Sequence, residues 1–204
     1  MNYDIKTDSY IEINKFGDKC YYVNNVLHRE DGPAVEYSSG SKKWYKNGKL
    51  HRENGPAVEH SNGSKYWYKE DLCHREDGPA MELFDGTKYW YKDDHLHRED
   101  GPAIEDHSGH KEWYKNGKLH RDGGPAKEYA DGTKCWYKNG MLHREDGPAI
   151  EFSNGNKSWY LENNRLTKSE FNKAIKVKVK AKATPTCEDK CVEVDGVKYK
   201  LVKI

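Results

Sequence analysis

The sequence lacks long apolar runs and a surplus of charge of one sign. No apolar stretch in the 204 residues approaches the ~20 that a membrane-spanning helix needs. The first ten residues, MNYDIKTDSY, contain neither the basic nor the apolar region of a signal peptide. Lys and Arg number 35 and Asp and Glu 34, a balance that removes the strongest argument for a nucleic-acid binder. We therefore expect a soluble, cytoplasmic protein.

The sequence also lacks a regular disulfide framework. Its five cysteines are an odd, irregularly spaced set, which predicts reduced thiols: Cys20, Cys73, Cys135, Cys187 and Cys191. The pair Cys187 and Cys191 has no further ligands nearby in sequence, so we expect neither a zinc site nor a cofactor.

Apolar residues are scarce, at 34% of the chain with a mean hydropathy of −1.16, a composition that first suggests disorder. The aromatic content excludes it. Fifteen Tyr, six Trp and four Phe make 12% of the chain, and such residues supply much of the burial that opposes chain entropy. The chain is predicted to fold around a thin core.

The strongest feature is a repeat of 23 residues. His-Arg recurs at a constant interval with Gly-Pro-Ala, Glu, Lys and Trp-Tyr in the same register, and we number the copies one to six by their histidines: His28, His51, His74, His97, His120 and His143. The consensus is WYKNGKLHREDGPAxExxxGxKx. Both ends deviate from it, as terminal units of a repeat array must do to close the stack.

Each copy contains two turn signals, such as Asn47-Gly48 and Asn62-Gly63, which supply the positive φ angles of tight hairpins. The segments 56–60 and 65–69 between turns have the length and alternation of strands. We therefore predict an all-β, elongated antiparallel β-meander of 23-residue hairpin units, in which the adjacent Trp and Tyr point to opposite faces. Trp is expected to form the core with Ala of Gly-Pro-Ala and the Leu before His.

The stretch Trp44 to His51 resembles the MORN repeat, a 23-residue β-hairpin module, and the likeness covers roughly residues 17–167. The chain departs from that pattern where Arg-Glu-Asp-Gly-Pro-Ala replaces small Gly-x-Gly steps. This variant resembles the LHREDGPA arrays of bacteriophages and large DNA viruses, and it is similar to MORN-variant proteins described as antitoxins. The resemblance implies an elongated sheet used as an interaction scaffold, with no single activity.

Three regions follow from this pattern. Residues 1–20 are an N-terminal cap and leading half-repeat, and residues 21–167 hold the repeats. Residues 168–204 form a Lys-rich unit of net charge +5, which leaves −4 for residues 1–167. Alternation over 174–183 predicts a half-buried strand, and Val-rich segments around Asp195-Gly196 predict a hairpin after it.

The recurring His, Arg, Glu and Asp have two interpretations. In the structural one, Arg pairs with acidic residues of the loops while His bonds the loop backbone. In the functional one, a row binds an anionic ligand or nucleic acid through His51, Arg52, His74, Arg75, His97, Arg98, His120 and Arg121. Neighbouring copies should lie about 9 to 10 Å apart, too far for two histidines to share a metal ion.

Positions that vary between copies do not serve the shared fold, so they are either neutral or a recognition surface. The candidate partner-binding residues are Tyr66, Leu83, Phe84, Tyr89 and Glu112. We predict a non-enzymatic scaffold that binds a host or cognate protein, and the resemblance to the LHREDGPA arrays implies a phage or viral protein that antagonises a host factor. The alternatives are a sponge for an anionic ligand or nucleic acid, and an antitoxin-like inhibitor of a toxin.

Overall fold

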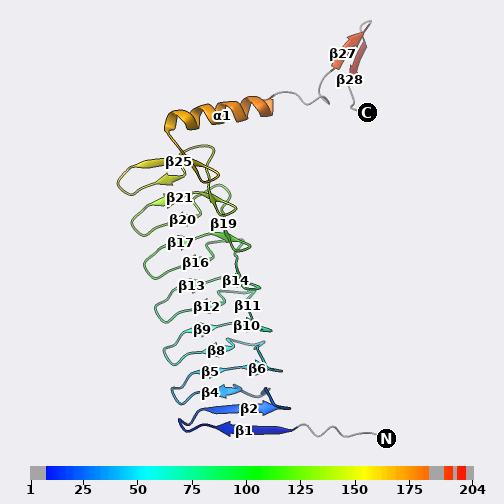
Figure 1. Cartoon of the computed structure of the whole chain (residues 1–204), viewed down its shortest axis with the longest axis vertical. Coiled ribbons are helices and arrows are strands. Elements are labelled where there is room, and N and C mark those ends of the chain that lie inside the picture. The colour runs from blue at the N-terminus through cyan, green and yellow to red at the C-terminus, as the bar shows by residue number, and fades with distance from the viewer. Residues whose placement is uncertain (1–7, 184–190, 195–196, 201–204) are drawn as a thin grey trace.

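The computed structural model describes residues 8–183, 191–194 and 197–200. The chain forms one long antiparallel sheet whose strands are stacked along the long axis of the molecule (Figure 1). Each neighbour in the sheet is the next sheet strand in sequence, and the first and last strands do not pair with each other. The predicted all-β meander of 23-residue hairpin units is therefore confirmed, and the array is open.

The central sheet begins with longer strands at β1 (Ser9–Ile13) and β2 (Lys19–Val23), with β3 (Val26–Leu27) beside β2. Two-residue strands follow in pairs: β4 (Val35–Glu36), β5 (Lys42–Lys43), β8 (Val58–Glu59), β9 (Lys65–Tyr66), β12 (Met81–Glu82), β13 (Lys88–Tyr89), β16 (Ile104–Glu105), β17 (Lys111–Glu112), β20 (Lys127–Glu128), β21 (Lys134–Cys135) and β24 (Ile150–Glu151). The sheet ends at β25 (Lys157–Leu161) and β26 (Asn164–Leu166).

A second row of short hairpins runs beside the central sheet (Figure 1). These are β6 (Tyr45–Lys46) with β7 (Lys49–Leu50), β10 (Tyr68–Lys69) with β11 (Leu72–Cys73), β14 (Tyr91–Lys92) with β15 (His95–Leu96), β18 (Tyr114–Lys115) with β19 (Lys118–Leu119), and β22 (Tyr137–Lys138) with β23 (Met141–Leu142). Their turns use positive φ angles, at Asn116 (49°) and Gly117 (72°) for example.

The predicted five-residue strand 65–69 is divided at Trp67, and the same break occurs at Trp44, Trp90, Trp113 and Trp136, whereas β25 runs unbroken through Trp159. The N–H of Trp67 donates to the carbonyl of Ala80 at 2.8 Å, outside the ladder pairs. The residue before Trp therefore belongs to the central sheet and the residue after it to the second row. A unit has four short strands, not the two that turn signals alone predicted.

The core is thinner than predicted. In every copy the residue with no exposed surface is the alanine of Gly-Pro-Ala, and the set is Ala34, Ala57, Ala80, Ala103, Ala126 and Ala149. The tryptophans are only partly buried. A single-layer sheet is too thin to cover a tryptophan completely, so among the described residues only the small alanine side chains are fully buried.

The C-terminal region differs from its prediction. Residues 174–183, expected as a strand, belong to the helix α1 (Lys168–Ala183). The predicted hairpin is present as β27 (Cys191–Val194) paired with β28 (Val197–Lys200), while its turn and residues 201–204 lie outside the described residues. In the described part of the chain, no helix is both long and apolar enough to cross a membrane.

Candidate functional site

Each repeat places an arginine at the centre of a loop that connects the two rows of strands. In copy four, Nη1 of Arg98 donates to Glu105 at 2.8 Å and to the carbonyl of Pro102 at 3.2 Å, while Nε donates to Asp100 at 3.0 Å. The guanidinium carbon lies 4.0 Å from the ring centroid of Trp90. The predicted pairing of Arg with acidic residues of the loops is therefore confirmed at Asp100, while the second partner, Glu105, lies on strand β16.

The glycine of Gly-Pro-Ala closes the other side of the guanidinium. A Cβ at Gly101 would lie 2.8 Å from Cζ of Arg98, a distance that real Cβ atoms essentially never show. At the corresponding glycines of the other copies, an added Cβ would lie 2.9 to 3.2 Å from Cζ of the arginine. Glycine at this position therefore lets the guanidinium keep its place, whereas a Cβ would push it aside, and in most copies positive φ plays no part.

The histidines join successive copies. The N–H of Asn116, in the turn of the next hairpin, donates to Nδ1 of His97 at 3.2 Å, and an equivalent contact of 3.0 to 3.3 Å occurs in every copy. The prediction that His bonds the loop backbone is therefore correct in kind, but the backbone belongs to the following unit. This contact is a reason for the constant interval of the array.

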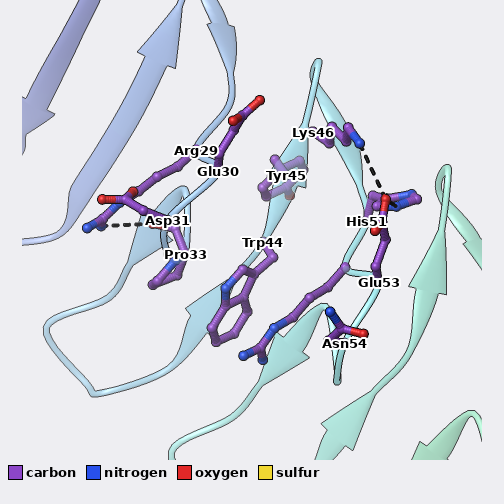
Figure 2. A pocket seen from close by; sticks show the side chains of 12 residues that line it. Arg29, Glu30, Asp31, Pro33, Trp44, Tyr45, Lys46, His51, Glu53 and Asn54 are labelled. Carbon is purple, nitrogen blue, oxygen red and sulfur yellow. Dashed lines mark hydrogen bonds and ion pairs between the residues drawn. The ribbon is translucent and has the colours of Figure 1, made fainter.

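A groove lies between each loop and the next. Figure 2 shows the first, with a volume of about 610 Å³, where Trp44 lies between the loop of Glu30 and Asp31 and the loop of Glu53 and Asn54. Four further grooves repeat this lining along the array. The hydrogen bond from Arg29 lowers the pKa of Asp31. Hydrogen bonds from the arginines of their own copies likewise lower the pKa values of Asp77, Asp100 and Asp146.

The residues of the proposed anion-binding row line these grooves but are already engaged. The arginine side chains are 19 to 33% exposed and each is paired with the glutamate seven residues later, as Arg75 is with Glu82. Among the described residues, no three His, Cys, Asp or Glu side chains are placed to hold a metal ion. The geometry thus gives an anionic ligand few free donors in this row.

A second candidate region is the side of the central sheet opposite the Glu and Lys columns, which we call the variable face. It is partly covered: Val35, Val58 and Cys135 on it belong to the buried core, so the prediction that variable positions do not serve the fold is wrong for these three. Consecutive residues of a strand point to opposite sides, so the residues beside the Glu and Lys columns share this face. They are Val35, Lys43, Val58, Tyr66, Met81, Tyr89, Ile104, Glu112, Lys127, Cys135, Ile150 and Ser158. These positions differ from copy to copy in size and charge.

The middle of the variable face is apolar. Met81 lies between Tyr66 and Tyr89 in the sheet register, and all three are partly buried. Leu83 follows at the hairpin turn, and Phe84 beside it is 71% exposed. The N–H of Phe84 donates to Oγ of the buried Ser64 at 3.0 Å, which holds this backbone in place. Four of the five predicted partner-binding residues therefore lie on two adjacent hairpins.

The fifth predicted residue, Glu112, lies in a polar cluster next to that patch and is buried. Its carboxylate accepts from Nε2 of His110 at 2.7 Å, from Tyr114 Oη at 2.8 Å and from Lys127 Nζ at 2.9 Å. Burial alone would raise the pKa of Glu112, but these hydrogen bonds outweigh it and lower the pKa. Burial, followed by the bond to Glu112, raises the pKa of Tyr114.

The sequence reasoning missed the partners of Glu112. His110 stands where other copies have Ser, Thr or Asn, and Lys127 where they have Val, Met or Ile. The departures are His110 and Glu112 at the end of copy four and Lys127 in copy five, and their side chains meet across the sheet. Joint departures in neighbouring copies are a signal that could have identified the cluster. In copy five Trp113 stacks under Arg121 while Tyr114 reaches Glu112, so the two neighbours point to opposite sides as predicted.

No protein-family model matches this chain, and no curated protein is similar to it in sequence at a significant level.

Proposed function

We propose that this chain is a non-enzymatic scaffold that binds another protein through the apolar middle of its variable face. One observation carries the proposal: residues that differ between copies gather on one face, where Met81 lies between two tyrosines, and the hairpin turn that follows Met81 and Leu83 exposes Phe84 to 71%. Tyrosine and large apolar side chains supply contact area with little ordering cost, and they are common at the energetic centre of interfaces.

The residues that are the same in every copy support the assignment of binding to the variable face, because their side chains are already used inside the array. His, Arg, Trp and Gly of each copy are engaged in contacts within the array, as described for copy four. An enzyme needs one constellation in one place, whereas these residues recur along the chain. The finer prediction, a phage or viral protein that antagonises a host factor in the cytoplasm, rests on the LHREDGPA resemblance alone, as does an antitoxin-like role.

The test is affinity capture from the lysate of a candidate host, with nuclease added, using the wild type and a Tyr66→Ser/Phe84→Ser variant. Truncation of interface hot spots typically costs about 2 kcal/mol or more, roughly thirtyfold in affinity, so the variant should lose the captured protein. Phe152→Ser is the matched control, because Phe152 is also an exposed aromatic at a hairpin turn and lies three copies further along.

We expect one stoichiometric protein with the wild type and with Phe152→Ser. Equal recovery by the double variant, with unchanged circular dichroism, would remove the patch from the interface. Loss of all captured material on nuclease treatment would favour the nucleic-acid alternative.

A further inference from the structure

The His-Arg loops present negative charge to solvent although each contains an arginine. The acidic residue directly after each arginine, which we call the rim carboxylate, is far more exposed than the arginine itself. In the first five copies the rim carboxylates are 71 to 89% exposed, and they are Glu30, Glu53, Glu76, Glu99 and Asp122. The arginines behind them are covered and paired. A ligand that approaches the loops therefore meets carboxylates first.

Copy six shows what such a carboxylate binds. Lys178, which belongs to α1 and not to the repeats, donates from Nζ to the rim carboxylate Glu145 at 3.1 Å. Glu145 is 44% exposed, compared with 84% for Glu76 at the equivalent position. A lysine thus already lies at two of the six equivalent positions: Lys178 of the helix at Glu145, and Lys46 of the array at 3.5 Å from Glu53.

A buried nitrogen lies behind the rim in several copies. The side chains of His74 and His143 are only 10% and 8% exposed, and Nε2 of each has no hydrogen-bond partner among the described residues. Nε2 of His74 points toward the rim carboxylate Glu76 at 3.7 Å, too long for a hydrogen bond. In copy four the same contact, from His97 to Glu99, is 3.0 Å. The Nε2 atom of these histidines is therefore left without a hydrogen bond directly behind the rim carboxylate.

We propose that the row of rim carboxylates binds a lysine-rich polypeptide segment, with one lysine at each loop as Lys178 is at Glu145. Successive loops are two strand spacings apart, about 9.5 Å. A polyproline II chain has three residues per turn and rises about 3.1 Å per residue, so lysines at every third residue lie on one side of it, about 9.3 Å apart, and match this interval. The backbone of such a segment also carries the hydrogen-bonding groups that the buried histidines lack. This surface is separate from the variable face and does not depend on the function proposed for it.

The test is a fluorescence-anisotropy titration of the full chain with a labelled peptide of repeated Lys-Ser-Ala, long enough to reach four loops. Binding should weaken about tenfold or more between about 50 and about 200 mM salt, because exposed ion pairs are screened. Glu76→Gln/Glu99→Gln should weaken it about fivefold. The control Asp8→Asn/Glu12→Gln removes two exposed charges at the N-terminal end of the sheet, away from the loops, and should change it less than twofold.

Three results would overturn the proposal: no binding at low salt, an equal loss with the control pair, or undiminished binding of the same peptide after acetylation of its lysines. Competition with spermine shows whether the row recognises a lysine-rich polypeptide or any polyamine. If spermine binds as tightly as the peptide, the row selects amines and not a polypeptide. A Glu76→Lys/Glu99→Lys variant, which should bind the corresponding Glu-Ser-Ala peptide instead, keeps the test decisive should the Gln variants have altered stability.

Discussion

At the scale of single residues, the constant part of the repeat is a stack of three groups: an aromatic ring, a guanidinium and a glycine backbone. Arg98 makes its contacts with Trp90, Gly101, Glu105 and Asp100 within a single copy. A cation over an aromatic face and charge-assisted hydrogen bonds are both stronger when partly shielded from water, as here. This stack explains why His-Arg and Gly-Pro-Ala keep the same register.

Gly101→Ala should destabilise the protein by about 1 to 3 kcal/mol, because a methyl group cannot occupy the space that the guanidinium fills. The effect should nearly vanish in an Arg98→Ala background. A double-mutant cycle from urea unfolding measures this coupling directly. Additive costs would mean that the glycine is needed for the loop backbone and not for the arginine.

Trp90→Ala should lower the free energy of unfolding by about 3 kcal/mol. His97→Ala should lower it clearly less, because this change removes only one acceptor for a backbone N–H. Trp90→Tyr should be much milder, because Arg29 already stacks at 4.0 Å on Tyr21 in the first copy. Thermal melts rank the three variants. If His97→Ala unfolds the protein while Trp90→Ala does not, the link between copies contributes more to stability than the stack within a copy.

Acid should weaken the loops. The hydrogen bond from Arg98 lowers the pKa of Asp100 below its unfolded value, so this contribution is present above the unfolded pKa of about 3.9 and is lost as pH falls through the folded pKa. The Tm difference between wild type and Asp100→Asn should therefore shrink from pH 6 towards pH 2. In an Arg98→Ala background the same change should show no such pH dependence.

At the scale of elements, the hairpin repeat could be read from turn residues and period, but the break at Trp67 could not. Alternation over 65–69 is compatible with one strand, and only the bond from Trp67 N–H to Ala80 directs the chain from one sheet to the next. Local patterns carry no information about which distant carbonyl a backbone group will meet. For the same reason, the sequence did not predict that Lys127 would lie opposite Glu112 in the sheet.

The helix α1 was a wrong prediction with a visible signal. Alternating Lys and apolar residues favoured a strand, yet Thr167 and Glu170 stand at capping-box spacing just before. Oγ1 of Thr167 accepts from the N–H of Glu170 at 3.3 Å, and the Glu170 carboxylate accepts from the N–H of Thr167 at 2.8 Å. Phe171 then packs to 5% exposure at the end of the sheet, where α1 contacts β25 and β26.

Phe171→Ala should destabilise the end of the array by about 3 kcal/mol, and Thr167→Ala by about 1 kcal/mol through loss of the cap. Hydrogen exchange locates the effect: protection should fall in β25 and β26 and remain unchanged in β8 and β9. A uniform loss of protection along the chain would show that the array unfolds as one block.

At the scale of the whole molecule, the array is open and each unit contacts its neighbours through the His links and the sheet ladder. Stability of such an array is close to a sum of unit and interface contributions. Removal of residues 86–108 or of residues 132–154, one unit each, should leave a folded protein with a cooperative melt. The two deletions should lower the free energy of unfolding by similar amounts, whereas collapse of either would indicate a closed core.

The two deletions also show whether the partner binds the constant loops or the variable face. Deletion of 86–108 removes Tyr89 from beside Met81, while deletion of 132–154 leaves the patch from Tyr66 to Tyr89 intact. The most direct measurement is the affinity of both folded deletions for the protein captured by the wild type. We expect loss of binding for the first and retention for the second. Equal affinities would contradict recognition by the variable face and assign binding to the constant loops.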